Sequence, residues 1–181
     1  PKHTLIKKEN GFEIREYEPM IIAKTSVRSD YSDAASTGFR RIASYIFGGN
    51  SASMSIEMTA PVLTNTPDPE DIYEIQFVMP SEHSMEDLPQ PNSQNVTLKK
   101  VNLGKTAVLR FGGWATKDRA SHYQNKLSDL LAASGYTVNG TFMVAQYNSP
   151  WAIPPFRKNE IIVQIKSVSY THLTLPTIAI V

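Results

Sequence analysis

The chain of 181 residues contains no cysteine, no surplus of charge of either sign and no long apolar run. Without cysteine, disulfides, thiolate metal ligands and cysteine nucleophiles are excluded. Eighteen Lys and Arg residues stand against 17 Asp and Glu residues, and the formal net charge of +1 lacks the basic footprint of a nucleic-acid-binding protein. We therefore expect one globular domain with no nucleic-acid partner and no membrane span. The compartment stays open between cytoplasm and periplasm.

Two stretches of the chain repeat the same order of predicted elements. Residues 12–48 and 99–135 each have the pattern of a strand, a turn and a helix, and two further strand-like runs follow each helix. Asp30 and Thr116 are the predicted N-caps of the two helices. The repeat is one of pattern, because few residues are identical between the halves.

Each predicted helix has one apolar stripe and one polar face. The stripe of the first helix is predicted at Ala35, Phe39, Ile42 and Ile46. A helix with a single stripe lies on the outside of a sheet. The order β-α-β-β, taken twice, therefore predicts an α+β domain with largely antiparallel strands and two helices packed outside.

Two clusters of residues are candidates for ligand binding. In "FRRIASYIFGGN", Arg40 and Arg41 follow Phe39 and are predicted to project away from the apolar stripe; the alternative is a pair of solvated arginines on an amphipathic helix. The second cluster gathers bulky aromatic residues at or near strand ends beside a cation: Phe111, Trp114, Trp151, Phe156 and Arg157. Such a cluster would suit a flat, apolar ligand that carries carboxylates, and the alternative is that it caps the core.

Signals for catalysis or metal binding are weak. No nucleophile elbow, phosphate loop or paired-histidine spacing occurs, so we expect no enzyme activity. His83, in the polar linker between the halves, and His122, on the second helix, are both expected to be solvated. Met58 in "EMTAPV" is kept as a candidate ligand-binding residue, although such a methionine more often fills a gap in a core than ligates iron.

Five stretches together resemble the SOUL family of heme-binding proteins. They are "GFEIREYEPMIIAKT", "GFRRIASYIFGGN", "IEMTAPV", "AVLRFGGWAT" and "YNSPWAIPPFRKNEI". The resemblance implies a distorted β-barrel built from two similar halves and flanked by two helices. It also implies non-covalent binding of heme or another tetrapyrrole in an apolar cleft along a helix, with cations near the propionates and without a strong axial ligand from the protein.

The resemblance covers residues 4–166, and it leads to a SOUL-type domain at residues 1–167. Residues 168–181 contain "VSYTHLTLP", which is similar to translated adapter sequence, and we expect this tail not to be native. The favoured hypothesis is a monomeric carrier or buffer of tetrapyrroles. The alternative is a small-molecule sensor or interaction module that uses the same cleft for a non-heme ligand or a peptide.

Overall fold

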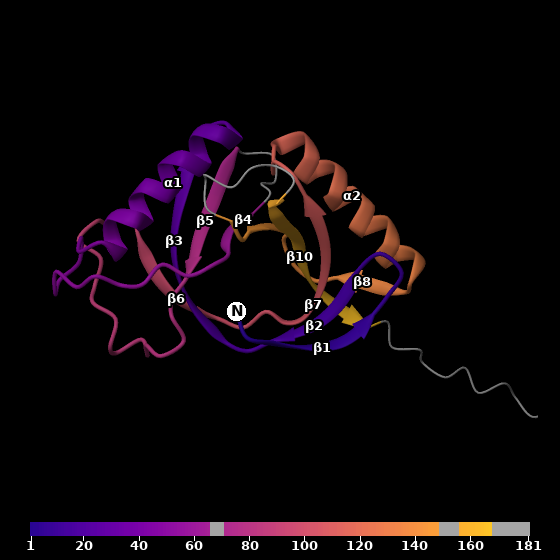
Figure 1. Cartoon of the computed structure of the whole chain (residues 1–181), viewed down its shortest axis with the longest axis horizontal. Helices are drawn as coiled ribbons and strands as arrows, with labels where there is room; N and C mark the ends of the chain where they lie inside the picture. Colours follow the sequence, from indigo (N-terminus) through magenta and orange to yellow (C-terminus); the bar gives the residue numbers. More distant parts are fainter. Residues whose placement is uncertain (66–70, 149–155, 168–181) are drawn as a thin grey trace, which may run out of the picture.

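The computed structural model describes residues 1–65, 71–148 and 156–167, which fold into a curled antiparallel sheet with two helices on its outer side (Figure 1). The elements in chain order are β1 (His3–Lys8), β2 (Glu13–Tyr17), β3 (Met20–Arg28), α1 (Tyr31–Ile46), β4 (Val62–Asn65), β5 (Ile72–Val78), β6 (Thr97–Val101), β7 (Gly104–Gly112), α2 (Lys117–Ala133), β8 (Tyr136–Val138), β9 (Met143–Gln146) and β10 (Lys158–Ser167). This confirms the predicted α+β fold with largely antiparallel strands and two outer helices, and the distorted barrel has the form of a half-barrel.

The order of strands in the sheet confirms the repeat. It runs β1-β2-β7-β10-β9-β4-β5-β3-β6, and the short β8 pairs with the end of β10. The central pair is β9 and β4, which are antiparallel. On one side follow β10, β7 and β2, and on the other β5, β3 and β6. The two sides therefore match strand for strand, and β1 is an addition at one edge.

Each long strand predicted at the start of a half is broken into two strands. In the first half the break is at Glu18 and Pro19, where proline has no N–H to donate to a ladder. In the second half it is at Asn102 and Leu103, and the Asn102 side chain accepts the backbone N–H of Gly104 at 3.1 Å. Because of these breaks, β2 pairs with β7 and β3 pairs with β6. The chain thus crosses between the two halves twice.

The predicted caps are confirmed at both helices. The Asp30 side chain accepts the N–H of Asp33 at 2.9 Å, and the Thr116 hydroxyl accepts the N–H of Arg119 at 3.3 Å. A cap of this kind satisfies one of the amides that a helix start leaves without an intrahelical partner. Both helices are followed by a glycine with positive φ, Gly48 at 111° and Gly135 at 77°.

The buried side of α1 differs by one position from the predicted stripe. Its buried residues are Ala34, Gly38, Ile42, Tyr45 and Ile46, whereas Ala35 and Phe39 are only partly buried. The physical reason is Gly38: a Cβ built there would lie 2.6 Å from Cγ1 of Ile75. The helix therefore packs tightly against β5 at Gly38, which has no side chain. A pattern of apolar side chains cannot predict such a contact.

Three apolar clusters hold these layers together. One lies between α1 and the strands β3 and β5, and a second lies between α2 and the strands β7 and β10. The third covers the concave face of the sheet, with Tyr17, Ile22, Leu63, Val108 and Ile162 among its members. The helices thus pack on the convex face, and the concave face carries its own core.

Candidate ligand-binding site

The predicted site residues on α1 have three different environments. Phe39 is partly buried, with its ring centroid 5.4 Å from that of Phe77 on β5. Arg40 is exposed, and its guanidinium donates to the hydroxyl of Thr37 at 3.4 Å. Arg41 instead donates to the backbone oxygen of Ser26 on β3 at 3.1 Å. Arg41 therefore fastens the helix to the sheet, and Arg40 carries the exposed charge.

The predicted residues at the ends of β7 and β10 divide into buried and exposed groups. Phe111 is 6% exposed and stacks on Tyr123 of α2 with centroids 4.5 Å apart, so it belongs to the core between helix and sheet. Trp114 is 50% exposed and Phe156 is 69% exposed. The Arg157 guanidinium carbon lies 3.9 Å from the centroid of the Trp114 ring, which is the geometry of a cation–π contact.

The remaining two predicted site residues are Met58 and Trp151. Met58 is 41% exposed and lies in the segment between α1 and β4. Trp151 lies outside the described residues. The structure thus brings Trp114 and Arg157 into contact, while Phe39, Arg40 and Arg41 lie on the helix of the other half.

A buried ion-pair network links β2 to β10. Arg15 on β2 is 1% exposed and donates twice to Glu160 on β10, from Nη2 at 2.8 Å and from Nη1 at 3.1 Å. Glu160 also accepts the hydroxyl of Tyr147 at 2.7 Å, and Arg15 also donates to Tyr17 and Glu13. With Arg110 beside the two glutamates at 3.5 and 3.7 Å, the network contains two positive and two negative charges.

The network shifts the pKa values of its members in consistent directions. Burial alone would lower the pKa of Arg15, but hydrogen bonds to Glu160 and Tyr17 outweigh it and raise the pKa. Burial raises the pKa of Tyr147, and the neighbouring charge of Glu160 raises it further. Burial would also raise the pKa of Glu13, yet hydrogen bonding and the charge of Arg15 lower it. These shifts favour the charged forms of Arg15 and Glu13 and the neutral hydroxyl of Tyr147, and those forms make the hydrogen bonds of the network.

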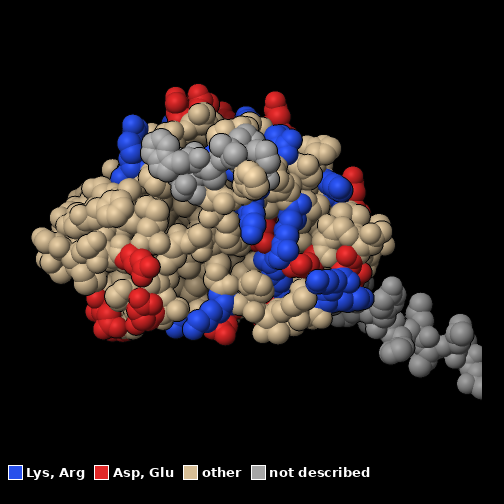
Figure 2. All heavy atoms as spheres, in the orientation of Figure 1, with Lys and Arg blue, Asp and Glu red and all other residues tan. Residues whose placement is uncertain are grey.

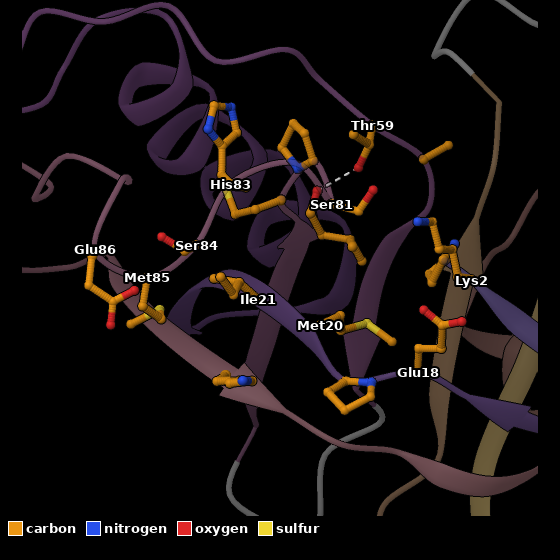
Figure 3. A pocket seen from close by; sticks show the side chains of 17 residues that line it. Lys2, Glu18, Met20, Ile21, Thr59, Ser81, His83, Ser84, Met85 and Glu86 are labelled. Atoms are coloured by element: carbon orange, nitrogen blue, oxygen red, sulfur yellow. Dashed lines mark hydrogen bonds between the residues drawn. The ribbon is translucent and has the colours of Figure 1, made fainter.

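A pocket of about 630 Å³ lies at the start of β3, away from the predicted aromatic residues (Figure 3). Its walls come from residues 1–2, the turn between β2 and β3, the segment before β4, the end of β5 with residues 80–86 and one residue of β6. Met20, Val78 and Met79 form a buried apolar floor. Sequence reasoning missed this pocket, because its walls are far apart along the chain and none carries a motif.

His83 is half-buried and lines this pocket, so it is less exposed than a residue of a solvated linker would be. The reason is that residues 80–86 fold back over the start of β3 instead of extending into solvent (Figure 3). His122 is exposed, as predicted, and His172 lies outside the described residues. No cluster of three potential metal ligands from His, Cys, Asp and Glu occurs among the described residues.

The surface charges are mixed, and the helices are not of the membrane-spanning kind within the described residues. On the face in Figure 2, Lys and Arg side chains are interspersed with Asp and Glu, and they do not merge into one basic patch. No helix within the described residues has the length and apolar character needed to cross a membrane.

These features define an α+β protein in which a curled antiparallel sheet carries two outer helices and forms a pocket of ligand size. The chain belongs to the SOUL heme-binding protein family, whose model matches residues 1–164. It is 31% identical over 158 residues to heme-binding protein 2 of Mus musculus, covering 83% of this chain and 76% of that protein. It is 32% identical over 147 residues to heme-binding protein 2 of Homo sapiens, covering 77% and 71%.

Solved structures share the fold at low sequence identity. The C-terminal domain of EcmrR matches with a TM-score of 0.66 and 14% identity, over 87% of this chain and 98% of that domain. A hydrolase from Listeria innocua matches with a TM-score of 0.61 and 12% identity, over 89% and 94%. At this level of identity the similarity concerns the fold alone.

Proposed function

We propose that this protein binds heme or a related tetrapyrrole non-covalently, as a monomeric carrier or buffer, and that it catalyses no reaction. Membership of the SOUL family and the two relatives named heme-binding protein 2 support the ligand class. The observation that carries the site is the pair of Trp114 and Arg157, in which a half-exposed indole lies against the buried guanidinium of Arg157.

The chemistry of a tetrapyrrole matches an exposed aromatic surface beside cations. Its large apolar face gains roughly 25 cal/mol for each Å² removed from water, before ordering terms are subtracted. Trp114 and Phe156 offer such area because both rings are largely exposed. The two propionates need donors at the rim of the site, where a single exposed cation contributes at most about 1 kcal/mol. Contact with aromatic walls should therefore dominate the affinity.

The residues on the other half complete the proposed site. Phe39 and Met58 would contribute apolar surface, and Phe111 would support the wall from the core. Arg40 is the better candidate for a propionate, because Arg41 already bonds to β3. Trp151 is proposed as a further wall residue on the strength of the sequence pattern alone.

Within the described parts of the chain, no histidine belongs to the proposed site. His122 is exposed on α2, and His83 lines the separate pocket. We expect the double variant His83→Ala/His122→Ala to keep the hemin spectrum and affinity of the parent protein, because axial ligation would otherwise govern the spectrum. Loss of a six-coordinate low-spin spectrum in this variant would contradict the proposal.

Hemin titration followed at the Soret band tests the proposed function. Trp114→Ala and Trp151→Ala should weaken hemin binding more than Arg40→Ala or Arg41→Ala does. Phe47→Ala is the matched control, since Phe47 is 65% exposed at the far end of α1 and lies outside the proposed site. Rising salt should weaken binding only slightly, because screening acts on the smaller contribution. If hemin binds no better than to an unrelated protein, a sensor of another small molecule or of a peptide becomes the better hypothesis.

A further inference from the structure

The pocket at the start of β3 has a different set of lining residues from the surface proposed for the tetrapyrrole, although Met58 of that surface directly precedes Thr59 of the pocket wall. Among the described residues proposed for the tetrapyrrole, none lines the pocket. Its volume of about 630 Å³ falls in the range of about 300–1,000 Å³ that is typical of sites for small organic ligands. The cavity, with walls from five segments of the chain, is therefore large enough to hold a small organic ligand.

The floor of the pocket is apolar and adaptable. Met20 is 9% exposed, Val78 7% and Met79 4%, so these residues are almost fully packed and expose only a small part of their surface to the cavity. Met85 on the segment 80–86 adds a third thioether at the side (Figure 3). Methionine is flexible and polarisable, and it suits apolar ligands of variable shape.

The rim of the pocket carries charged residues whose arrangement favours an anion. Lys100 on β6 pairs in register with Ile21 on β3, and both line the pocket. This register places Lys100 beside the residue that follows Met20 of the apolar floor. The Lys2 carbonyl accepts the N–H of Glu18 at 3.0 Å, which sets these opposite charges on neighbouring strands. Neither Lys100 nor Lys2 forms an ion pair within the described part of the chain.

The wall also carries polar side chains that can donate hydrogen bonds. His83 and the hydroxyl of Ser81 face the cavity from residues 80–86 (Figure 3). Thr59 is not available, because its hydroxyl donates to the Val78 carbonyl at 2.5 Å. Two carboxylates also line the pocket: Glu18 lies beside Lys2, and Glu86 lies at the opposite end of the cavity (Figure 3).

From this geometry we propose that the pocket is a second ligand-binding site, which takes small amphipathic carboxylates. The apolar chain or ring of the ligand lies on Met20, Val78 and Met79. Its carboxylate is held at the rim by Lys100, with His83 and Ser81 as further donors. This inference goes beyond tetrapyrrole binding, and it concerns a different part of the molecule.

Decanoate is a suitable probe, because it combines an apolar chain with one carboxylate. In protein labelled at the methionine methyl groups, NMR should show saturable shifts for Met20, Met79 and Met85. Met54 and Met143 should stay unchanged, since they do not line the pocket. Decyltrimethylammonium, which has the same chain and the opposite charge, should bind more weakly. Equal or tighter binding of this cation would overturn the assignment of the pocket to anions.

Two substitutions locate the site. Ser81→Trp should abolish saturable decanoate binding, because Ser81 is exposed and a bulky side chain there fills the cavity. Lys100→Gln should raise the dissociation constant by about two- to fivefold, as expected for one exposed charge. Lys99→Gln is the matched control, since its side chain points to the other face of β6. If Lys99→Gln and Lys100→Gln behave alike, or if Ser81→Trp binds decanoate normally, the proposal is refuted.

Hemin binding by Ser81→Trp separates this proposal from the proposed function. The variant should bind hemin like the parent protein, since Ser81 is not among the residues proposed for the tetrapyrrole surface. Loss of both ligands in Ser81→Trp would show that the pocket itself is the tetrapyrrole site, and the second site would not exist. Decanoate binding to a protein that binds no hemin would refute the tetrapyrrole proposal and leave the pocket assignment intact.

Discussion

The buried pair of Arg15 and Glu160 makes a quantitative prediction about stability. Glu160→Gln keeps the size of the side chain but removes its charge, so Arg15 loses its two charge-assisted bonds to Glu160. Arg15 is 1% exposed, so water cannot replace the hydrogen bonds that its guanidinium loses. It keeps Glu13 as a partner, which limits the effect.

The expected loss follows from what is known of buried ion pairs. Removing one partner of such a pair costs about 3–5 kcal/mol. Since Glu13 still neutralises part of the charge on Arg15, we expect the lower end, about 3 kcal/mol. For a domain of this size that corresponds to a fall of roughly 6–12 °C in the melting temperature.

Urea unfolding and thermal melting of matched variants test this reasoning. Glu16→Gln is the control, because it makes the same change at an exposed position on β2 next to Arg15. The double variant Arg15→Met/Glu160→Leu should be more stable than Glu160→Gln, since neither charge is then left without its partner. A Glu160→Gln protein as stable as Glu16→Gln would show that the network contributes nothing to stability.

Three further predictions concern packing, titration and the tail. Gly38→Ala should lower the free energy of unfolding by about 1–3 kcal/mol, because its Cβ would lie 2.6 Å from Ile75; an unchanged urea midpoint would contradict this packing. Burial raises the pKa of Tyr31 to about 12, so the folded state holds this proton more tightly than the unfolded chain, whose tyrosines titrate near 10. Stability should therefore fall as pH rises from 10 towards 12, by about 1.4 kcal/mol per pH unit from this residue, and equal slopes for Tyr31→Phe and the parent would refute it. Deleting residues 168–181 should leave the melting temperature unchanged, and a clear drop would identify the tail as a native element.

Local patterns in the sequence were sufficient for the two helices and the order of the main strands, but not for β1, for β8 or for the breaks between β2 and β3 and between β6 and β7. Asp30 and Thr116 mark helix starts because a cap depends only on residues within the first turn. The repeat of a strand, a helix and two further strands appears in the sheet as two matching sides around β4 and β9. Family membership also followed from short stretches, which the match over residues 1–164 confirms.

Tertiary structure decided which of the candidate residues are exposed. Phe111 and Trp114 are both aromatic residues near the end of β7, yet one stacks on α2 in the core and the other is half exposed against the buried Arg157. Their difference depends on the position of α2, which no pattern around either residue encodes. Arg41 differs from Arg40 for a similar reason, because β3 lies within its reach.

The contacts that bring distant segments together were beyond sequence reasoning altogether. Arg15 and Glu160 are 145 positions apart, and an arginine in an alternating strand gives no sign that a carboxylate will meet it in the interior. The pocket likewise joins Lys100 to Ile21 through strand register, and it places His83 over a floor formed by other strands. Periodicity and capping are properties of neighbouring residues, so the sequence alone determined the two helices, the main strands and their repeat. Burial of charge and the shape of a cavity depend on how the chain crosses between the two halves, and only the folded molecule determined them.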